Sequence, residues 1–354
     1  MGGVQISVVK LHVAQEVARA AVLCRSLKMD AQDGADLCFP QLINTSCKKP
    51  AFPQTEDLIL YVAMFLISLV TVVLNLLVII SVSHFRQLHT PTNILLLSLA
   101  VSDLLVGFLL TPIEIKRKTA CWFVGDIMCS LHGYLSCNIV IVSIGNMVLI
   151  SADRYVAICD PLHYPTKFTV TRVKVCVCLC WLYSILYSGL IVLDDLMHPG
   201  KYNSCYGECV IVITFIAGVI DLAFTFLLPV SVIIILYMSV FVVAVSQARA
   251  MRSHVTAVTL QVSASLTAKK SELKAARTLG ILVIVYLMCF CPFYCVLLAG
   301  DSTSSASFIA FVFYFNSCLN PMIYALFYPW FRKAVKLIVT LQILQPGSCE
   351  ANIL

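Results

Sequence analysis

The segment NSCLNPMIYALFYPWF, residues Asn316 to Phe331, places Pro321 inside a long apolar run. A proline frees a backbone carbonyl in a helix, which is costly unless neighbouring polar groups satisfy it, as happens inside membrane bundles. Ser317 and Asn320, with Asn316, lie within about a turn and a half of the proline. The stretch therefore predicts a kinked helix at membrane depth, with a polar pocket around the kink.

The composition is that of a membrane protein. Of the 354 residues, 60% are hydrophobic and 12% are charged, whereas a soluble domain carries roughly 25% charged residues. A membrane-spanning helix needs roughly 20 apolar residues, and seven segments of the chain are long enough. They lie at 58–83, 93–113, 127–151, 175–195, 210–246, 279–299 and 306–327. We therefore predict an all-α membrane protein built as a bundle of seven transmembrane helices.

The distribution of basic residues predicts the orientation. Most Lys and Arg between the spans lie in the loops after the first, third and fifth segments and in the C-terminal tail, and such loops face the cytoplasm. The N-terminus then lies outside a plasma membrane that the chain crosses several times, and the sequon at Asn44 is available for glycosylation. The net charge of +6 faces anionic membrane lipid and an intracellular partner, and it does not indicate nucleic acid. Acids such as Glu114, Asp194 and Asp195 fall in outer loops, where they either aid solubility or attract cations.

The chain divides into three predicted regions. Residues 1–57 form an extracellular N-terminus, of which 1–28 lack the core of a signal peptide and are either a disordered extension or a wrongly predicted start. Residues 58–327 form the membrane domain. Residues 328–354 form a short amphipathic eighth helix and a cytoplasmic tail.

The motifs resemble those of one receptor family. The NPxxY core at Asn320–Tyr324 resembles the seventh helix of rhodopsin-like G-protein-coupled receptors, and the longer pattern NSxxNPxxYxxxYxWF resembles that of trace amine-associated receptors. The resemblance covers about residues 37–340. It implies a rhodopsin-like bundle, a small amine ligand and a heterotrimeric G protein of the stimulatory or olfactory type that raises cyclic AMP. It implies no cofactor, and no catalytic constellation is visible in the sequence.

The cytoplasmic ends of two helices carry the residues that such receptors use for activation. Asp153-Arg154-Tyr155 ends the third segment. Glu272, 20 residues before Pro292, lies about 30 Å down the sixth helix and reaches Arg154 as a second restraint. The resemblance adds to this set the residues Asn320, Pro321 and Tyr324 of the seventh helix.

A cluster of polar residues in the membrane interior is a candidate sodium site. Asp103 lies mid-helix, where an ionisable group is costly and needs a reason. Asp103, Ser143, Asn316 and Asn320 resemble the sodium-binding set of the receptor family. The alternative is a hydrogen-bonded polar core without an ion.

Two disulfides are implied by the resemblance. Cys129 pairs with Cys209, which holds the second outer loop, and Cys47 pairs with Cys205, which ties the N-terminus to that loop. Cys38 competes with Cys47 for this second bridge, because connectivity is not readable from a sequence.

The predicted ligand-binding acid is on the fifth segment and not on the third, where amine receptors usually have it. Amine receptors carry an aspartate 18 residues before the arginine of the third helix, but here that position is Ser136. Asp221 instead lies eight residues before Pro229 in the fifth segment, about 12 Å from the proline and at the depth of the missing acid. This resembles a branch of the family, expanded in fish, with the amine-binding acid on helix five. The alternative is a protonated Asp221 bonded to a polar neighbour.

Aromatic residues share the depth of Asp221. Phe293, Tyr294 and Tyr314 are predicted to complete a cage suited to a cation, and Phe290 replaces the usual tryptophan as the switch at the pocket floor. The leading hypothesis is therefore a small-amine receptor. The alternatives are a receptor of the same fold for a ligand that is not an amine, for which Ser136 is the best argument, and a transporter, for which the internal repeat is missing.

Overall fold

The computed structural model describes residues 37–42, 44–50, 55–254, 280–281, 283–295 and 306–353. These residues fall into two units. The smaller unit joins the N-terminal segment up to Lys49 with the loop Ser204–Glu208, and the larger unit contains the rest. Within the described residues, β-structure is limited to two isolated bridges, Leu37 with Lys48 and Ser46 with Tyr206, both in the smaller unit.

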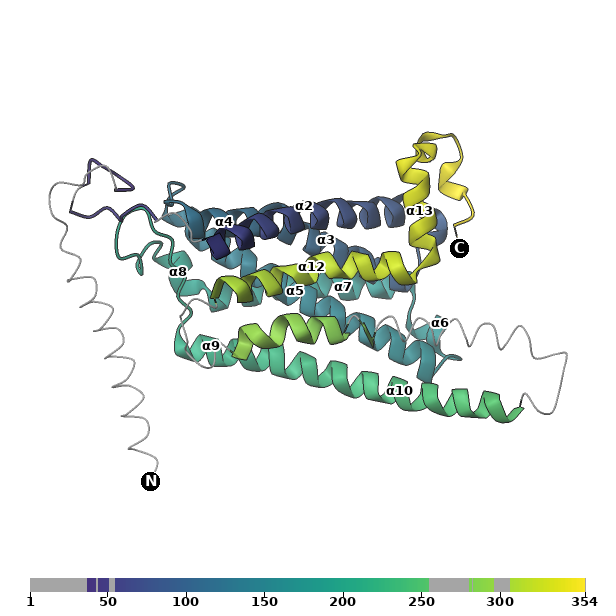
Figure 1. The fold of residues 1–354 in the computed structure, drawn as a ribbon. Helices are drawn as coiled ribbons and strands as arrows, with labels where there is room; N and C mark the ends of the chain where they lie inside the picture. Colours follow the sequence, from purple (N-terminus) through teal and green to yellow (C-terminus); the bar gives the residue numbers. More distant parts are fainter. Residues whose placement is uncertain are drawn as a thin grey trace, which may run out of the picture. The chain divides into compact units, whose positions relative to one another are not determined.

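The larger unit is helical, and its long helices run side by side (Figure 1). Helix α5 packs against α3, α7 and α10, while α2 packs against α3 and α12. The described helices are α2 (Thr55–His84), α3 (Pro91–Leu105), η3 (Val106–Leu110), α4 (Thr111–Thr119), α5 (Asp126–Cys159), α6 (Tyr164–Lys167), α7 (Val170–Ile191), α8 (Leu193–Met197), α9 (Phe215–Asp221), η4 (Leu222–Leu227), α10 (Leu228–His254), α12 (Ala306–Phe327) and α13 (Pro329–Val339), with short 3₁₀ turns η2 (Arg86–Leu88), η5 (Gln342–Leu344) and η6 (Ser348–Glu350).

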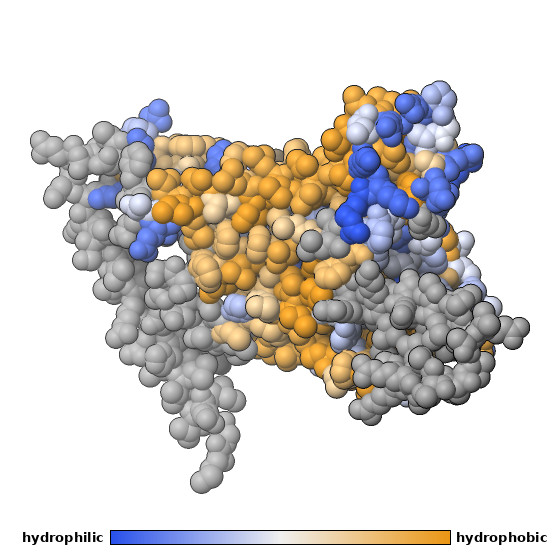
Figure 2. All heavy atoms as spheres, turned by 45° about the vertical axis from the view of Figure 1, so that its right-hand side comes forward, coloured by the Kyte–Doolittle hydropathy of each residue, from blue (hydrophilic) through white to orange (hydrophobic). Residues whose placement is uncertain are grey.

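The helices are long and apolar enough to cross a membrane. In the part of the chain that the structure describes, five helical stretches pass by length and composition: Thr55–His84, Pro91–Thr119, Asp126–Cys159, Val170–Ile191 and Ile216–Val243. Residues 283–295 and α12 cover the sixth and seventh predicted segments. The outward surface of these helices is largely hydrophobic, and hydrophilic side chains gather near α13 (Figure 2). The predicted all-α membrane architecture is confirmed.

The carbonyl that Pro321 leaves without a donor in α12 accepts a hydrogen bond from another helix. Pro321 lies inside α12 and has no N–H to donate to the carbonyl oxygen of Ser317, four residues earlier. The side-chain amide of Asn75 on α2 donates to that oxygen at 3.1 Å, and also to the Thr71 carbonyl in its own helix at 2.9 Å. The polar pocket predicted around Pro321 thus extends to α2.

Replacing Asn75 by Ala is expected to lower the free energy of unfolding by about 1–3 kcal/mol, because the Ser317 carbonyl is then buried without a donor. The measurement is the Tm of the purified protein in detergent. Ser81→Ala is the matched control, since Ser81 is equally buried on the same helix but donates only to the Leu77 carbonyl of that helix, at 2.6 Å. An unchanged Tm in Asn75→Ala would show that the carbonyl finds another donor.

Two π-helical turns interrupt the helices, and each ends two residues before a proline. The turn Val106–Leu110 precedes Pro112, and the turn Leu222–Leu227 precedes Pro229 by two residues. A threonine hydroxyl bonds a backbone carbonyl at each: Thr111 to Val106 at 3.0 Å, and Thr225 to Asp221 at 2.6 Å. Such turns are frequent at functional sites. The second turn begins immediately after Asp221.

The second span is longer than predicted. The sequence predicted that this span ends at residue 113, ahead of a run of charged residues. In the structure, α4 continues the helix to Thr119, with Pro112 in its first turn, where a missing N–H does no harm. Glu114, assigned to an outer loop, is therefore a buried helical residue. At the other end of the unit, α13 is bent by 94° from α12 and forms the predicted eighth helix.

Candidate functional site

A cavity of about 530 Å³ lies within the larger unit. Small-molecule sites typically have volumes of about 300–1,000 Å³. Its wall is formed by α4, α5, the segment before α9, α9 with η4, residues 293–294 and α12. Five predicted ligand-contacting residues line it: Ser136, Asp221, Phe293, Tyr294 and Tyr314.

Asp221 brings a carboxylate to this wall. It is the last residue of α9 and is half-buried. No Lys, Arg or His among the described residues forms an ion pair with it. Ser136 on α5 also lines the cavity, and its Oγ is buried without a hydrogen-bond partner. The cavity thus holds an unpaired acid and an unpaired hydroxyl.

Aromatic rings form the wall near Asp221. Tyr294 stacks on Phe226 with ring centroids 4.3 Å apart, and its hydroxyl lies 3.0 Å from Thr225 Oγ1. Phe293 meets Tyr294 edge-on at 5.3 Å, and Phe313 at 5.1 Å. An acid beside aromatic faces is a suitable site for an organic cation.

Phe290, the predicted switch, is not among the lining residues of the cavity. It is buried one layer deeper, against Tyr286 at 4.4 Å and Phe313 at 4.8 Å. Phe313 itself lines the cavity, so this ring lies between the cavity and Phe290. Tyr314, the neighbour of Phe313, lies at the cavity wall as predicted.

The cavity is also lined by a cluster of charged residues on α4 and α5. The sequence did not predict this cluster. Arg117 binds both carboxylate oxygens of Glu114, with Nε 2.8 Å from one and Nη2 2.7 Å from the other. His132 Nε2 lies 3.4 Å from Glu114, and Lys118 lines the cavity beside them. The three-residue spacing of Glu114 and Arg117 could have indicated this ion pair, because residues one helical turn apart are neighbours on a helix.

The candidate sodium residues are all buried, on α3, α5 and α12. Asp103 is fully buried and accepts a hydrogen bond from the Asn320 amide at 2.8 Å. Ser143 bonds Ser102 on the helix of Asp103, at 3.2 Å. Asp103 Oδ1 and Asn316 Oδ1 are buried without partners. One of these oxygens belongs to a carboxylate and the other to an amide, and both are hard ligands of the type that a small cation prefers.

The inner end of α5 holds Arg154 in a network of hydrogen bonds. Asp153 is fully buried and accepts from Arg154 Nε at 2.9 Å, from Thr92 Oγ1 at 2.8 Å and from the Tyr164 hydroxyl at 2.8 Å. Arg154 also donates to Thr92. Its predicted second restraint, Glu272, lies outside the described residues.

Two other predicted activation residues are placed by packing. Tyr155 packs with the small apolar cluster of Ile158 and Val240. Tyr324 is fully buried in the main core, and its hydroxyl has no hydrogen-bond partner in the described part of the chain.

Both predicted cysteine pairs are disulfides in the structure. Cys129 at the start of α5 is joined to Cys209, and the carbonyl of Cys209 accepts from Arg117 at 3.1 Å. Within the smaller unit, Cys47 is joined to Cys205. Cys38, the predicted competitor of Cys47, is disulfide-bonded as well, as is Cys121.

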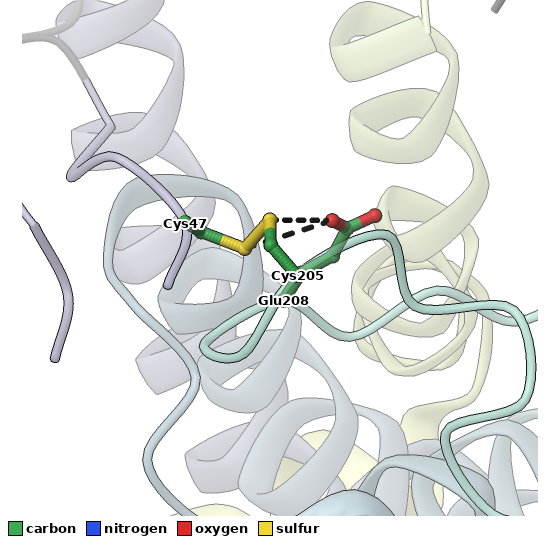
Figure 3. A group of neighbouring side chains, drawn as sticks. All are labelled: Cys47, Cys205 and Glu208. Carbon is green, nitrogen blue, oxygen red and sulfur yellow. Dashed lines mark hydrogen bonds between the residues drawn. A yellow bond between two sulfur atoms is a disulfide. The ribbon is translucent and has the colours of Figure 1, made fainter. Parts of the chain in front are cut away.

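The sulfurs of Cys47 and Cys205 lie beside a carboxylate. Figure 3 shows Glu208 approaching both, with its Oε2 3.7 Å from the first and 3.3 Å from the second. This is the single group of metal-ligating type found in the described residues. Sulfurs joined to each other carry no thiolate to bind a metal, so the group has a structural role. Asn44, the predicted glycosylation acceptor, is exposed nearby in the chain.

The two disulfides are expected to differ in effect. Cys129→Ser should abolish surface expression. The segment after Cys209 contributes Ile211 and Ile213 to the cavity wall, and without the disulfide it loses its anchor to α5. Loss of a native disulfide typically lowers the free energy of unfolding by about 2–5 kcal/mol. Cys47→Ser should spare most surface expression, since that bond lies within the smaller unit. Surface labelling of both variants measures this. Equal loss in both would contradict the distinction, and non-reducing peptide mapping is the control for the pairing.

The chain is similar to known receptors over most of its length. The family model described as "7 transmembrane receptor (rhodopsin family)" matches residues 74–324. Trace amine-associated receptor 13c of Danio rerio is 38% identical over 344 residues, covering 92% of this chain and 98% of the relative. Trace amine-associated receptor 5 of Rattus norvegicus is 38% identical over 332 residues, covering 90% and 95%. Trace amine-associated receptor 6 of Homo sapiens is 37% identical over 337 residues, covering 90% and 95%.

Proposed function

Because the chain belongs to the trace amine-associated receptors of the rhodopsin family of seven-transmembrane receptors, we propose that it responds to small amines and that Asp221 binds the ligand ammonium. The observation that carries the proposal is the carboxylate of Asp221 in the cavity wall without a cationic partner among the described residues. A buried acid is costly unless it is paired, and an ammonium ligand supplies the pair. The names of the relatives support an amine as the ligand class.

The aromatic wall extends the same proposal. Phe293, Tyr294 and Tyr314 line the cavity that Asp221 faces, and their ring faces stabilise the alkyl-ammonium group. Ser136 contributes a hydroxyl with an unused hydrogen bond, which orients the ligand but does not neutralise its charge.

Binding in the cavity would shift the receptor toward a state that engages a heterotrimeric G protein. The shift requires Arg154 to leave its bonds to Asp153 and Thr92, and the Glu272 restraint to break. The partner is a stimulatory or olfactory G protein that raises cyclic AMP, in an olfactory cell. The receptor is oriented with its N-terminus outside the plasma membrane. A sodium ion at Asp103, Ser143, Asn316 and Asn320 would stabilise the resting state.

The test is a panel of small primary, secondary and tertiary amines on transfected cells, with cyclic AMP as the readout and untransfected cells as the control. The proposal expects at least one amine to raise cyclic AMP only in cells that express the receptor, and the alcohol of the same carbon skeleton to be inactive. Responses to neutral molecules alone, at surface levels where a control receptor signals, would overturn the amine proposal. They would support the second candidate, a receptor for a ligand without an ammonium, which the hydroxyl of Ser136 favours.

A further inference from the structure

The cavity carries more positive than negative charge on its α4 and α5 side. Glu114 is buried and is already bound on both oxygens by Arg117, at 2.8 and 2.7 Å. His132 lies 3.4 Å from the same carboxylate. Glu114 and Arg117 cancel each other, so this acid has no free charge to offer a ligand ammonium.

Lys118 provides the excess positive charge. It lines the cavity, and no carboxylate in the described part of the chain lies within ion-pair distance of its ammonium. Its side chain is exposed, so the ammonium remains accessible to a ligand at the cavity wall. Lys116, two residues earlier, is also exposed but does not line the cavity.

His132 adds an unused polar atom. The residue is 4% exposed and lines the cavity. Its Nε2 faces Glu114 at 3.4 Å, while its Nδ1 is buried without a hydrogen-bond partner. Arg117 also has unused donors. Its Nε, Nη1 and Nη2 make three hydrogen bonds in the described part of the chain, to Glu114 and the Cys209 carbonyl, whereas a guanidinium has five donors.

The basic group and Asp221 are on separate elements of the wall. Arg117 and Lys118 are on α4, which packs against α2 and η3, whereas Asp221 ends α9, which packs against η4. Neither cation forms an ion pair with Asp221. A cavity of about 530 Å³ therefore presents a negative group and a positive group to the same small molecule.

We propose that the receptor binds a zwitterionic amine, with its ammonium on Asp221 and a carboxylate directed to Arg117, Lys118 and His132. The proposal rests on the proposed function and specifies its ligand class. A carboxylate is favoured over a neutral acceptor because it pairs the charge of Lys118 and accepts charge-assisted bonds from Arg117. The two groups must be separated by an alkyl chain, because their binding residues are on different helices.

A diamine is disfavoured by the same contacts. Its second ammonium would need an acid, and Glu114 is taken by Arg117. The two outer acids considered from the sequence, Asp194 and Asp195, do not line the cavity. Hydrogen bonds from Tyr202 and Lys201 lower the pKa of Asp194 to about 2, so this acid too is paired.

The test uses three ligands of equal chain length that differ at one end: pentylamine, 1,5-diaminopentane and 5-aminopentanoate, with homologues of three to seven carbons. Cyclic AMP is measured in cells with matched surface receptor. At one chain length the amino acid should be at least tenfold more potent than the alkylamine. Lys118→Gln and His132→Gln should remove most of that advantage, by lowering the potency of the amino acid much more than that of the alkylamine, whereas Lys116→Gln should change neither.

The failures of the two proposals are distinguishable. If alkylamines and diamines activate the receptor through Asp221 while the amino acids stay inactive at every length, the zwitterion inference is wrong and the proposed function stands. If Glu114→Gln removes only the diamine response, Glu114 is a second ammonium site and the inference is also wrong. If no amine of any series acts, at surface levels where a control receptor signals, both proposals fail.

Discussion

Cells that express Asp221→Ala are expected to give no cyclic AMP response to any amine that activates the unaltered receptor. Removing one partner of a buried charge pair costs about 2–5 kcal/mol, which is roughly a 30- to 5,000-fold loss of affinity. Asp221 is half-buried in the cavity wall, and no described cation pairs with it. The other acid that lines the cavity, Glu114, is bound on both oxygens by Arg117, so it offers the ammonium no free carboxylate. Surface labelling must show equal receptor numbers. An unchanged amine response at equal surface number would refute the assignment.

Ser136→Ala is the matched control for the Asp221 variant. It removes at most one neutral hydrogen bond, worth about 0.5–1.5 kcal/mol, so potency should fall by no more than about tenfold. The double variant Asp221→Ala with Ser136→Asp returns an acid to the cavity wall from α5. It should restore a response to some amines with a changed selectivity.

Arg154→Ala is expected to abolish signalling while ligand binding survives. Arg154 lies at the inner end of α5, bonded to Asp153 and Thr92 and far along the helix from Ser136 in the cavity. In the proposed mechanism its guanidinium becomes available to a G protein when these bonds break. Ligand binding to membranes and cyclic AMP in cells measure the two properties separately. Loss of binding together with signalling would mean that the variant is misfolded or that Arg154 shapes the cavity.

Glu272→Ala should have the opposite effect on signalling: it should increase cyclic AMP, whereas Arg154→Ala should abolish the response. Loss of this restraint on Arg154 should raise cyclic AMP without ligand, by an effect of about 1 kcal/mol, or a few-fold in the population of the active state. Basal activity per surface receptor is the readout. If it does not rise, the restraint on Arg154 comes from Asp153 and Thr92 alone.

Much of the fold was predictable because membrane helices are constrained by length and hydrophobicity. Pro321 with its polar neighbours identified the last membrane helix. The structure places Asn75 as the donor to the freed carbonyl, a contact between distant parts of the chain that periodicity does not reveal. The π-helical turns were not predicted. They depend on how Pro112 and Pro229 redistribute backbone hydrogen bonds within helices that otherwise look regular.

The sequence predicted the side of the cavity that carries Asp221 but not the side formed by α4 and His132. Asp221 was identified because an acid in an apolar segment is conspicuous. The cluster of Glu114, Arg117 and Lys118 was assigned to a loop, because several charges in a row end an apolar segment. In the structure Glu114 and Arg117 pair on a helix that continues to Thr119, and Lys118 forms no ion pair in the described part of the chain. His132 gave no signal in the sequence, since only the fold places it beside Glu114 of α4, at 3.4 Å.

The most direct test of the central claim is the affinity of purified receptor for the most potent amine of the panel, compared between the unaltered protein and Asp221→Asn. This substitution keeps the size of the side chain and removes its charge, so that folding and cavity shape are retained. We predict that the amine binds Asp221→Asn at least about 30-fold more weakly, while the alcohol of the same skeleton binds both proteins equally weakly. Equal affinity of the amine for the two proteins would contradict the claim that Asp221 carries the charge that binds the ligand.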